Sequence, residues 1–145
     1  MLLGRSREVA EIDCLLGDAR TGHGRGMLIS GEPGIGKSAL LELARERAAG
    51  MRVIAAVGIE AEASLAFATL AEIAGPLIAH LDTLPERQAA AIRTALALDG
   101  EASAGGDRLA ACAGLLGLLR VAADREPVLL LVDDAHWLDS ASAEC

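Results

Sequence analysis

The residues best suited to do chemistry lie in one short segment, Gly31-Glu32-Pro33-Gly34-Ile35-Gly36-Lys37-Ser38. This segment matches the pattern of a glycine, any four residues, and then glycine, lysine and serine or threonine at every fixed position. Lys37 is also the only lysine among the 13 Lys and Arg residues of the chain. A compact ammonium and a planar guanidinium are not interchangeable. The single lysine therefore marks this segment as a candidate site.

The chemistry that this pattern predicts is the binding of ATP or ADP with Mg²⁺. Glycines 34 and 36 allow backbone conformations and a close approach that a Cβ atom would forbid. The N–H groups from Gly34 to Ala39, at the start of a helix, can then converge on a phosphate. Lys37 would reach the β- and γ-phosphates, and the Ser38 hydroxyl would bind Mg²⁺. The candidate nucleotide-binding residues in the loop are Gly31, Glu32, Pro33, Gly34, Ile35, Gly36, Lys37, Ser38 and Ala39.

A second candidate group follows an apolar run near the end of the sequence, where Val128–Val132 leads into Asp133 and Asp134. The run predicts a buried strand that carries a carboxylate at its carboxyl end, where ligands of α/β proteins bind. Asp133 would hold Mg²⁺ through its water shell, and Asp134 would polarise an attacking water. An apolar strand that ends in Asp is common, but a phosphate loop in the same chain favours the functional interpretation. The catalytic candidates are thus Lys37 and Asp134, and the metal candidates are Ser38 and Asp133.

Other polar residues favour structural roles. No second His or Cys lies at ligand spacing from His136, so we expect a solvent-facing loop residue rather than a metal ligand. Trp137 is expected to anchor packing at the edge of the core, and Asp139 or Ser140 to cap a last helix. The glycines of segment 21–26 resemble a dinucleotide fingerprint, but they precede a predicted strand instead of following one.

The expected elements follow from apolar spacing and from turn residues. We expect helices over about 7–20 with Ser6 as N-cap, 37–49, 65–80 with a break at 75–76, 83–98 and from Asp107 onward, and buried strands over 27–30, 52–59 and 128–132. Thr83 and Glu86 fit a capping box. Leu109, Cys112, Leu116 and Leu119 are expected to form the inward stripe of the helix that Asp107 caps. Segment 99–106 is the most loop-like.

This order predicts an α/β fold with a parallel sheet flanked by helices, with three strands present. No internal domain boundary is evident, so residues 1–145 are expected to form a single domain. Hydrophobic residues make up 52% and charged residues 23% of the chain, which is typical of globular proteins.

Charge and cysteine content limit the partners. The net charge of −8 and the near absence of aromatic residues argue against direct nucleic-acid binding. Cys14, Cys112 and Cys145 form no CxxC pair, so we expect free thiols, packed as small hydrophobic side chains, in a reducing compartment. The charged amino-terminal segment predicts no signal peptide, and the longest apolar stretch is too short to span a membrane. We therefore expect a cytoplasmic protein with no membrane partner.

Four blocks of sequence together resemble one family. They are LLGRSREVAEIDCLL at the start, ISGEPGIGKSALL at the phosphate loop, SLAFATL followed by LPERQAAAI in the middle, and PVLLLVDDAHWLD near the end. The chain resembles the N-terminal ATPase module of the large ATP-binding LuxR-type transcriptional regulators. These signal-transduction ATPases are related to AAA+ and origin-recognition-type ATPases. The phosphate loop alone indicates only a P-loop NTPase, whereas DDAHWLD together with the amino-terminal GRxxE is more specific.

The resemblance implies roles for individual residues. Gly4 and Arg5 would line the adenine side of the pocket, Ser38 and Asp133 would serve Mg²⁺, and Asp134 would occupy the water-activating position. Such ATPases act as slow switches in which the nucleotide state controls assembly and output. The implied partners are the nucleotide, other regulator domains or a second copy of the chain.

The resemblance also implies a truncation after the second acidic strand. In the family the module continues into a sensor strand, which lies between the phosphate-loop strand and the strand carrying Asp133, and then into a lid and a winged helix. We therefore expect an incomplete sheet, and Mg-ATP or ADP binding with slow or absent hydrolysis. Two alternatives remain open: a compact P-loop NTPase or nucleotide kinase with genuine turnover, and a non-catalytic remnant that associates through its exposed sheet edge.

Overall fold

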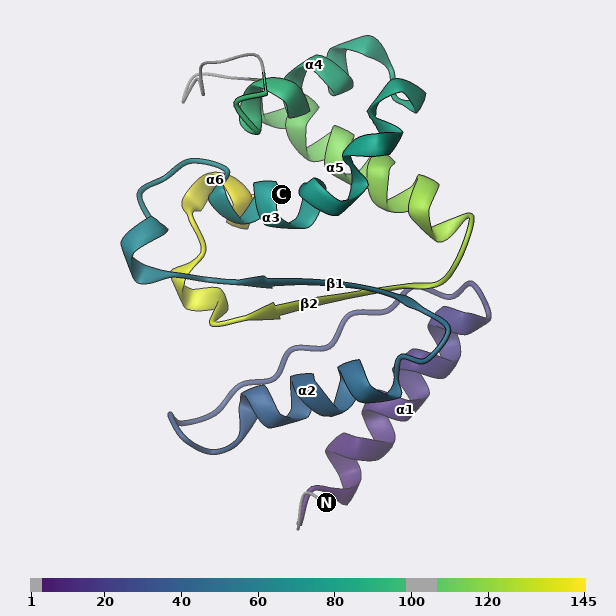
Figure 1. Ribbon diagram of the computed structural model, residues 1–145. Coiled ribbons are helices and arrows are strands. Elements are labelled where there is room, and N and C mark those ends of the chain that lie inside the picture. The colour runs from purple at the N-terminus through teal and green to yellow at the C-terminus, as the bar shows by residue number, and fades with distance from the viewer. Residues whose placement is uncertain (1–3, 99–106) are drawn as a thin grey trace. The chain divides into compact units, whose positions relative to one another are not determined.

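The mixed α/β fold contains a two-stranded parallel sheet. In the computed structural model, which describes residues 4–98 and 107–145, β1 (Arg52–Val57) pairs with β2 (Val128–Asp133). The two arrows run side by side in the same direction (Figure 1). The Arg52 N–H donates to the Pro127 carbonyl at 2.8 Å, and the Gly58 N–H donates to the Asp133 carbonyl at 3.0 Å. The predicted strands over 52–59 and 128–132 are thus confirmed, with small shifts at their ends.

The described residues form two compact units that share this strand pair. One unit holds the residues up to Val53 together with Glu126–Leu131. The other holds Ile54–Arg125 together with Val132–Cys145.

The first unit is built on two amphipathic helices, α1 (Ser6–Arg20) and α2 (Lys37–Arg47). Its buried core contains Ile12, Leu16, Leu40, Ala44, Ala48, Met51, Leu129 and Leu131. The Arg20 guanidinium donates to the Arg47 carbonyl at 2.8 Å, where the last carbonyls of α2 lack partners within the helix. Both predicted helices are confirmed. The expected Ser6 cap is wrong, because α1 already includes Ser6 and Arg5 occupies the N-cap position without a side-chain cap.

The predicted strand over Met27–Ser30 is not formed. The segment has no regular structure, and Leu28 is 87% exposed. A strand exists only where a neighbouring strand supplies backbone partners, and within residues 4–98 and 107–145 only β1 and β2 pair. Two of the three expected strands are therefore present. This agrees with the expectation of an incomplete sheet.

The second unit is mainly helical. It contains α3 (Ala68–Ala74), α4 (Glu86–Ala95), α5 (Arg108–Ala123), α6 (Ser140–Ala143) and 3₁₀ helices over Glu60–Glu62, Gly75–Thr83 and Ala135–Trp137. The expected break at residues 75–76 is confirmed, because α3 gives way there to a 3₁₀ helix with Pro76 in its first turn. The expected loop over 99–106 lies outside the described residues.

The expected capping box at the start of α4 is wrong. Pro85 occupies the N-cap position, and no side chain caps the helix. The Thr83 hydroxyl instead donates to the His80 carbonyl at 2.6 Å, so it serves the preceding 3₁₀ helix. At α5 the expected cap is confirmed, because the Asp107 carboxylate accepts the Ala110 N–H at 3.0 Å.

The buried face of α5 differs from the predicted stripe. The buried residues are Ala110, Ala111, Gly114, Leu115, Leu118 and Ala122, whereas Leu109 is 79% and Leu116 49% exposed. A Cβ at Gly114 would lie 2.7 Å from Ile92 Cγ1, and one at Gly117 would lie 2.6 Å from Leu84 Cδ2. Because Gly114 and Gly117 have no side chain, Ile92 of α4 and Leu84 can pack closely against α5. The prediction placed the large apolar residues of α5 inward, but its buried face consists mainly of small residues.

The expectation of three free thiols is wrong for two of them. Cys112 and Cys145 form a disulfide with an S–S distance of 2.02 Å and a Cα–Cα distance of 4.9 Å. Their sequence separation of 33 gives no local signal of pairing, which arises only because the fold brings the end of α6 beside α5. Cys14 is a free, exposed thiol, so its expected packing as a buried side chain is also wrong.

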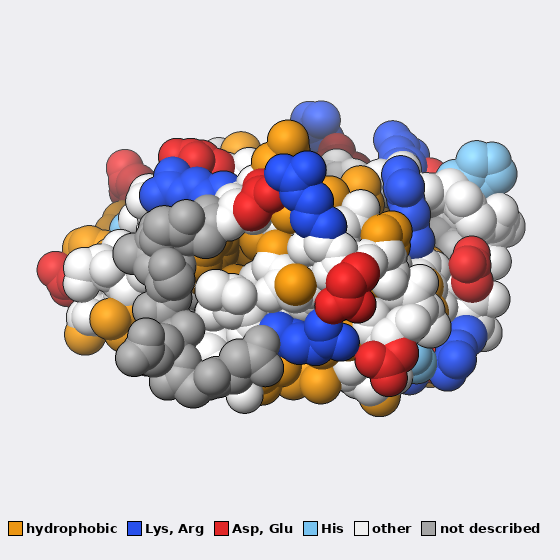
Figure 2. Space-filling view, turned by 90° about the horizontal axis from the view of Figure 1, so that it is seen from above, with side chains coloured by type: hydrophobic (Ala, Val, Ile, Leu, Met, Phe, Trp, Pro, Cys, Tyr) orange, Lys and Arg blue, Asp and Glu red, His pale blue; other side chains and the backbone are white. Residues whose placement is uncertain are grey.

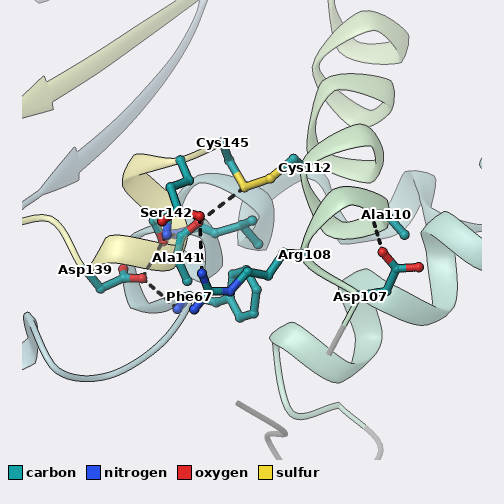
Figure 3. The surroundings of a disulfide bond; sticks show 11 residues. Phe67, Asp107, Arg108, Ala110, Cys112, Asp139, Ala141, Ser142 and Cys145 are labelled. Carbon is teal, nitrogen blue, oxygen red and sulfur yellow. Dashed lines mark hydrogen bonds and ion pairs between the residues drawn. A yellow bond between two sulfur atoms is a disulfide. The ribbon is translucent and has the colours of Figure 1, made fainter. Parts of the chain in front are cut away.

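Asp139 is confirmed as the N-cap of α6, and it also binds a second helix. The side chain is 2% exposed. Its Oδ1 accepts the N–H groups of Ser142 at 2.9 Å and Phe67 at 2.8 Å, and its Oδ2 accepts the Thr69 N–H at 3.1 Å (Figure 3). Phe67, which precedes α3, has a left-handed φ of 65°. One carboxylate therefore caps α6 and fixes the start of α3.

The charge of Asp139 is stabilised by these bonds. Burial raises the pKa of Asp139, but the hydrogen bonds from Ser142, Thr69 and Phe67 outweigh burial and hold the pKa below its ordinary value of 3.8. The carboxylate is therefore ionised at neutral pH and contributes to stability in that form.

We predict that Asp139→Ala lowers the free energy of unfolding by about 2 to 3 kcal/mol, because two N–H groups of another segment lose a charged acceptor. Urea denaturation measures this loss. Asp107→Ala is the matched control, since it removes an N-cap whose backbone N–H partner lies within its own helix, together with a largely exposed ion pair to Arg87, and it should cost clearly less. Equal losses in the two variants would contradict the bridging role of Asp139.

The same contribution depends on pH in a defined direction. Because folding lowers the pKa of Asp139, its stabilisation is fully present above 3.8 and is lost as the pH falls through the lowered pKa. We therefore predict that the stability difference between wild type and Asp139→Asn shrinks on acidification below about pH 4. Urea titrations at several pH values measure this, and a difference that widens in acid would count against it.

Candidate functional site

The glycine-rich loop before α2 has the backbone shape needed to receive an anion. Gly34 has a φ of 78° and Gly36, the N-cap of α2, has a φ of 93°. A Cβ at either position would meet nothing within 4 Å, so the left-handed conformation rather than crowding requires glycine. The first N–H groups of α2 have no acceptor within the helix, and its first turn carries no acidic residue. Their dipole favours negative charge at this point.

Lys37 folds back over the loop that precedes it. Its Nζ donates to the Gly31 carbonyl at 3.0 Å and to the Glu32 carbonyl at 3.1 Å. The ammonium is thus held against the loop backbone, at the start of α2. A phosphate oxygen would offer the same ammonium a stronger, charge-assisted bond in exchange for a carbonyl bond.

Arg5 connects the start of α1 to the same loop. Its guanidinium donates to the Ile35 carbonyl at 2.7 Å and to Glu8 Oε1 at 2.7 Å, and the side chain is 27% exposed. This hydrogen bond from Arg5 is the main cause that holds the pKa of Glu8 below its ordinary value. The structure thus brings the predicted residue Arg5 to the loop through a backbone contact. Gly4 precedes it with a left-handed φ of 77°.

The other predicted loop residues lie at the surface. Glu32, Pro33, Gly34, Ile35, Ser38 and Ala39 are exposed. The Ser38 hydroxyl is therefore accessible at the first turn of α2, which suits a cation ligand.

The acidic pair lies at the carboxyl end of β2, as predicted. Asp133 is half-buried, and its Oδ1 accepts the Asp134 N–H at 2.9 Å. Asp134 is exposed and has a left-handed φ of 46°, a conformation that Asp tolerates better than most residues. The turn that follows is the 3₁₀ helix Ala135–Trp137, in which His136 is exposed and Trp137 is half-buried.

Gly58 is a positioning residue that the sequence interpretation missed. A Cβ at this buried glycine would lie 2.3 Å from the Asp134 carbonyl oxygen and 3.0 Å from the Trp137 carbonyl carbon. Only glycine lets the end of β1 approach the acidic turn this closely. The available signal was a glycine inside an apolar strand pattern, which often marks such a backbone approach.

The structure thus assembles two groups, one in each compact unit. Arg5, Lys37 and the loop carbonyls form the first group, and Asp133, Asp134 and Gly58 form the second. Within residues 4–98 and 107–145, no cluster of three or more His, Cys, Asp or Glu side chains could hold a metal ion. In the same residues no helix is long and apolar enough to cross a bilayer. Acidic and basic side chains are interspersed on the face seen in Figure 2.

Comparison with known proteins identifies the family. The family model described as the AAA ATPase domain matches residues 1–145, which is the whole chain. The chain belongs to the AAA ATPase domain family. No curated protein and no solved structure gave a significant match.

An AAA ATPase domain is a nucleotide-binding module of the P-loop class, and such domains generally bind ATP or ADP with Mg²⁺. The loop in this AAA ATPase domain fits that requirement. It combines left-handed glycines, free helix-terminal N–H groups, an ammonium and an accessible hydroxyl.

We predict that Arg5→Ala loosens the loop of this AAA ATPase domain, because the Ile35 carbonyl loses its charged donor. Amide hydrogen exchange of residues 31–38 should become about two- to tenfold faster, as expected for one lost hydrogen bond. Arg7→Ala is the control, since Arg7 forms an exposed ion pair with Glu11 on the same helix and makes no hydrogen bond to the loop among the described residues. Unchanged exchange in Arg5→Ala would show that the contact does not hold the loop.

Proposed function

We propose that this AAA ATPase domain binds ATP and ADP with Mg²⁺ through residues Gly31–Ala39 and acts as a nucleotide-dependent switch. The observation that carries the proposal is the left-handed glycine loop that leads into α2 with Lys37 at its first position. Backbone N–H groups, the helix dipole and a lysine ammonium then act together on one anion.

In this proposal the residues divide the work. Lys37 exchanges its carbonyl partners for the β- and γ-phosphates, and Ser38 provides a hydroxyl ligand for the cation. Mg²⁺, when bound, neutralises phosphate charge. The roles of Asp133 as cation-binding acid and of Asp134 as water-polarising acid rest on the sequence pattern, an apolar strand that ends in two acids. Arg5 stabilises the loop by donating a hydrogen bond to the Ile35 carbonyl.

We further propose that the domain serves a LuxR-type transcriptional regulator. The support is the combination of GRxxE at Gly4–Glu8 with DDAHWLD at Asp133–Asp139 in one chain. In the structure, Arg5 and Glu8 of the first motif pair with each other, and Asp139 of the second caps two helices. Its partners would then be the nucleotide and other domains of the regulator, and its output would be slow control of assembly rather than fast turnover.

We predict that Lys37→Ala weakens the binding of Mg-ATP by about 10- to 150-fold, because it removes a charge-assisted bond to phosphate. Isothermal titration calorimetry measures the dissociation constant. Arg45→Ala is the matched control, since it removes one positive charge from the same helix at an exposed ion pair with Glu42. Equal affinities in wild type and Lys37→Ala would contradict the proposal.

The rate of ATP hydrolysis distinguishes a slow nucleotide switch from a P-loop NTPase or nucleotide kinase with genuine turnover. We expect phosphate release well below about 1 s⁻¹, the lower end of kinase rates. Asp134→Asn should leave nucleotide affinity nearly unchanged and remove any residual release. A release rate at or above that value in the wild type would favour an enzyme with genuine turnover.

A second candidate function is association through the open sheet edge. It is favoured by Leu130 on β2, which is 38% exposed. Leu28 is 87% exposed and lies in a segment that belongs to no strand, so it offers a second exposed apolar side chain for association. We predict that Leu28→Asp lowers any self-association of the wild type, as measured by light scattering at micromolar concentration. A wild type that is already monomeric under these conditions would count against this function.

A further inference from the structure

The two cysteine residues of the disulfide differ in their exposure to solvent. Cys112 lies on α5 and is half-buried, whereas Cys145, which follows α6, is an exposed residue. Figure 3 shows the bond that joins them. Exposed disulfides are generally more easily reduced than buried structural ones. Cys145 is therefore the more exposed residue of the pair.

The helix that this bond secures cannot stand alone. α6 contains four residues, far fewer than an isolated helix needs for stability. The disulfide and an ion pair between Arg108 and Glu144 at 3.2 Å join the α6 segment to α5. Both partners of the ion pair are about half exposed, so the pair contributes little. The disulfide is the stronger link.

The other side of α6 holds the start of α3. Asp139 accepts the N–H groups of Phe67 and Thr69, and the Ser142 hydroxyl oxygen accepts the Leu70 N–H at 2.9 Å. Phe67, the N-cap residue of α3, makes no side-chain hydrogen bond that would cap the helix. The capping of α3 therefore depends on where α6 lies, and the position of α6 depends in part on the disulfide.

We propose that Cys112–Cys145 is a thiol–disulfide exchange site for small thiols of the glutathione class, and that its redox state determines how firmly α6 caps α3. Nothing in this proposal depends on nucleotide binding.

The exchange balances in two steps. A small thiolate attacks Cys145 Sγ, so a mixed disulfide forms there while the bond to Cys112 breaks. The electron pair leaves on Cys112 Sγ, which then takes a proton from water. A second thiolate attacks the sulfur of the bound small thiol, releases the small-molecule disulfide and leaves Cys145 as a thiolate. Two small thiols are oxidised and one protein disulfide is reduced.

Neighbouring groups suit both ends of this reaction. Arg108 lies one helical turn before Cys112 on the same face of α5, where its positive charge favours a departing thiolate. Cys145 Sγ lies 3.5 Å from the Ala141 carbonyl oxygen, so a reduced Cys145 can donate to that carbonyl and stay beside α6. The reduced state thus retains a local position for Cys145 but loses the covalent link to α5.

The first experiment tests the redox control of the cap. Wild-type protein is equilibrated in buffers of varied reduced and oxidised glutathione, and its free thiols are counted by alkylation and mass spectrometry. On reduction, amide exchange of residues 67–70 should become about tenfold faster or more. The emission of Trp137, the only tryptophan, should shift to longer wavelength. Cys14→Ser, which retains both paired cysteines, is the matched control and should behave as wild type.

Cys145→Ser should show the fast exchange of residues 67–70 in every buffer. Exchange that does not change on reduction of the wild type would overturn the redox control of the cap. Failure of the pair to oxidise in oxidised glutathione would overturn the exchange site itself.

The second experiment tests which cysteine of the pair exchanges faster with glutathione. Each variant is incubated with oxidised glutathione. Cys112→Ser leaves Cys145 as the remaining thiol of the pair, and Cys145→Ser leaves Cys112. Both variants also carry Cys14→Ser, so only one thiol can react. We expect Cys145 to be glutathionylated faster than Cys112, because Cys112 is half-buried. Equal rates, or a faster Cys112, would contradict attack at Cys145.

Discussion

The parallel pairing of β1 and β2 joins two segments that lie far apart in the sequence, and its end hydrogen bonds involve Arg52 with Pro127 and Gly58 with Asp133. Parallel strands cannot be joined by a tight turn, so the chain between them must cross over through helices. α3, α4 and α5 form this crossover. The same pairing places Asp133 opposite Gly58, so the position of the acidic turn follows from the register of two strands.

Capping across segments then completes the second unit. Helix termini leave N–H groups without partners, and α3 begins with a left-handed Phe67 that has no side-chain cap of its own. Asp139 and Ser142 supply the missing acceptors from α6. Because α6 is too short to be stable alone, the two helices stabilise each other. The motif DDAHWLD thus begins with the two acids Asp133 and Asp134 and ends with Asp139, which has a structural role as a helix cap.

The conformation of the phosphate loop, by contrast, depends mostly on residues adjacent in sequence. Glycine is needed at positions 34 and 36 for φ values that other residues rarely adopt, and Lys37 and the start of α2 follow directly in sequence. Only the Arg5 contact with the Ile35 carbonyl comes from another helix. A motif whose geometry is built from adjacent residues can be recognised from sequence, and this explains why the phosphate loop is evident from one chain.

The amino-acid sequence by itself determined the loop Gly31–Ala39, the acidic end of β2, the caps at Asp107 and Asp139 and the existence of most helices. Each of these depends on spacing or on contacts within a few residues. Tertiary structure alone decided that 27–30 is not a strand, that α5 buries Gly114 instead of Leu116, that Gly58 must lack a side chain, and that Cys112 meets Cys145. The reason is physical: a strand needs a paired neighbour, a buried face needs a partner of matching shape, and a disulfide needs two distant segments brought within bonding distance.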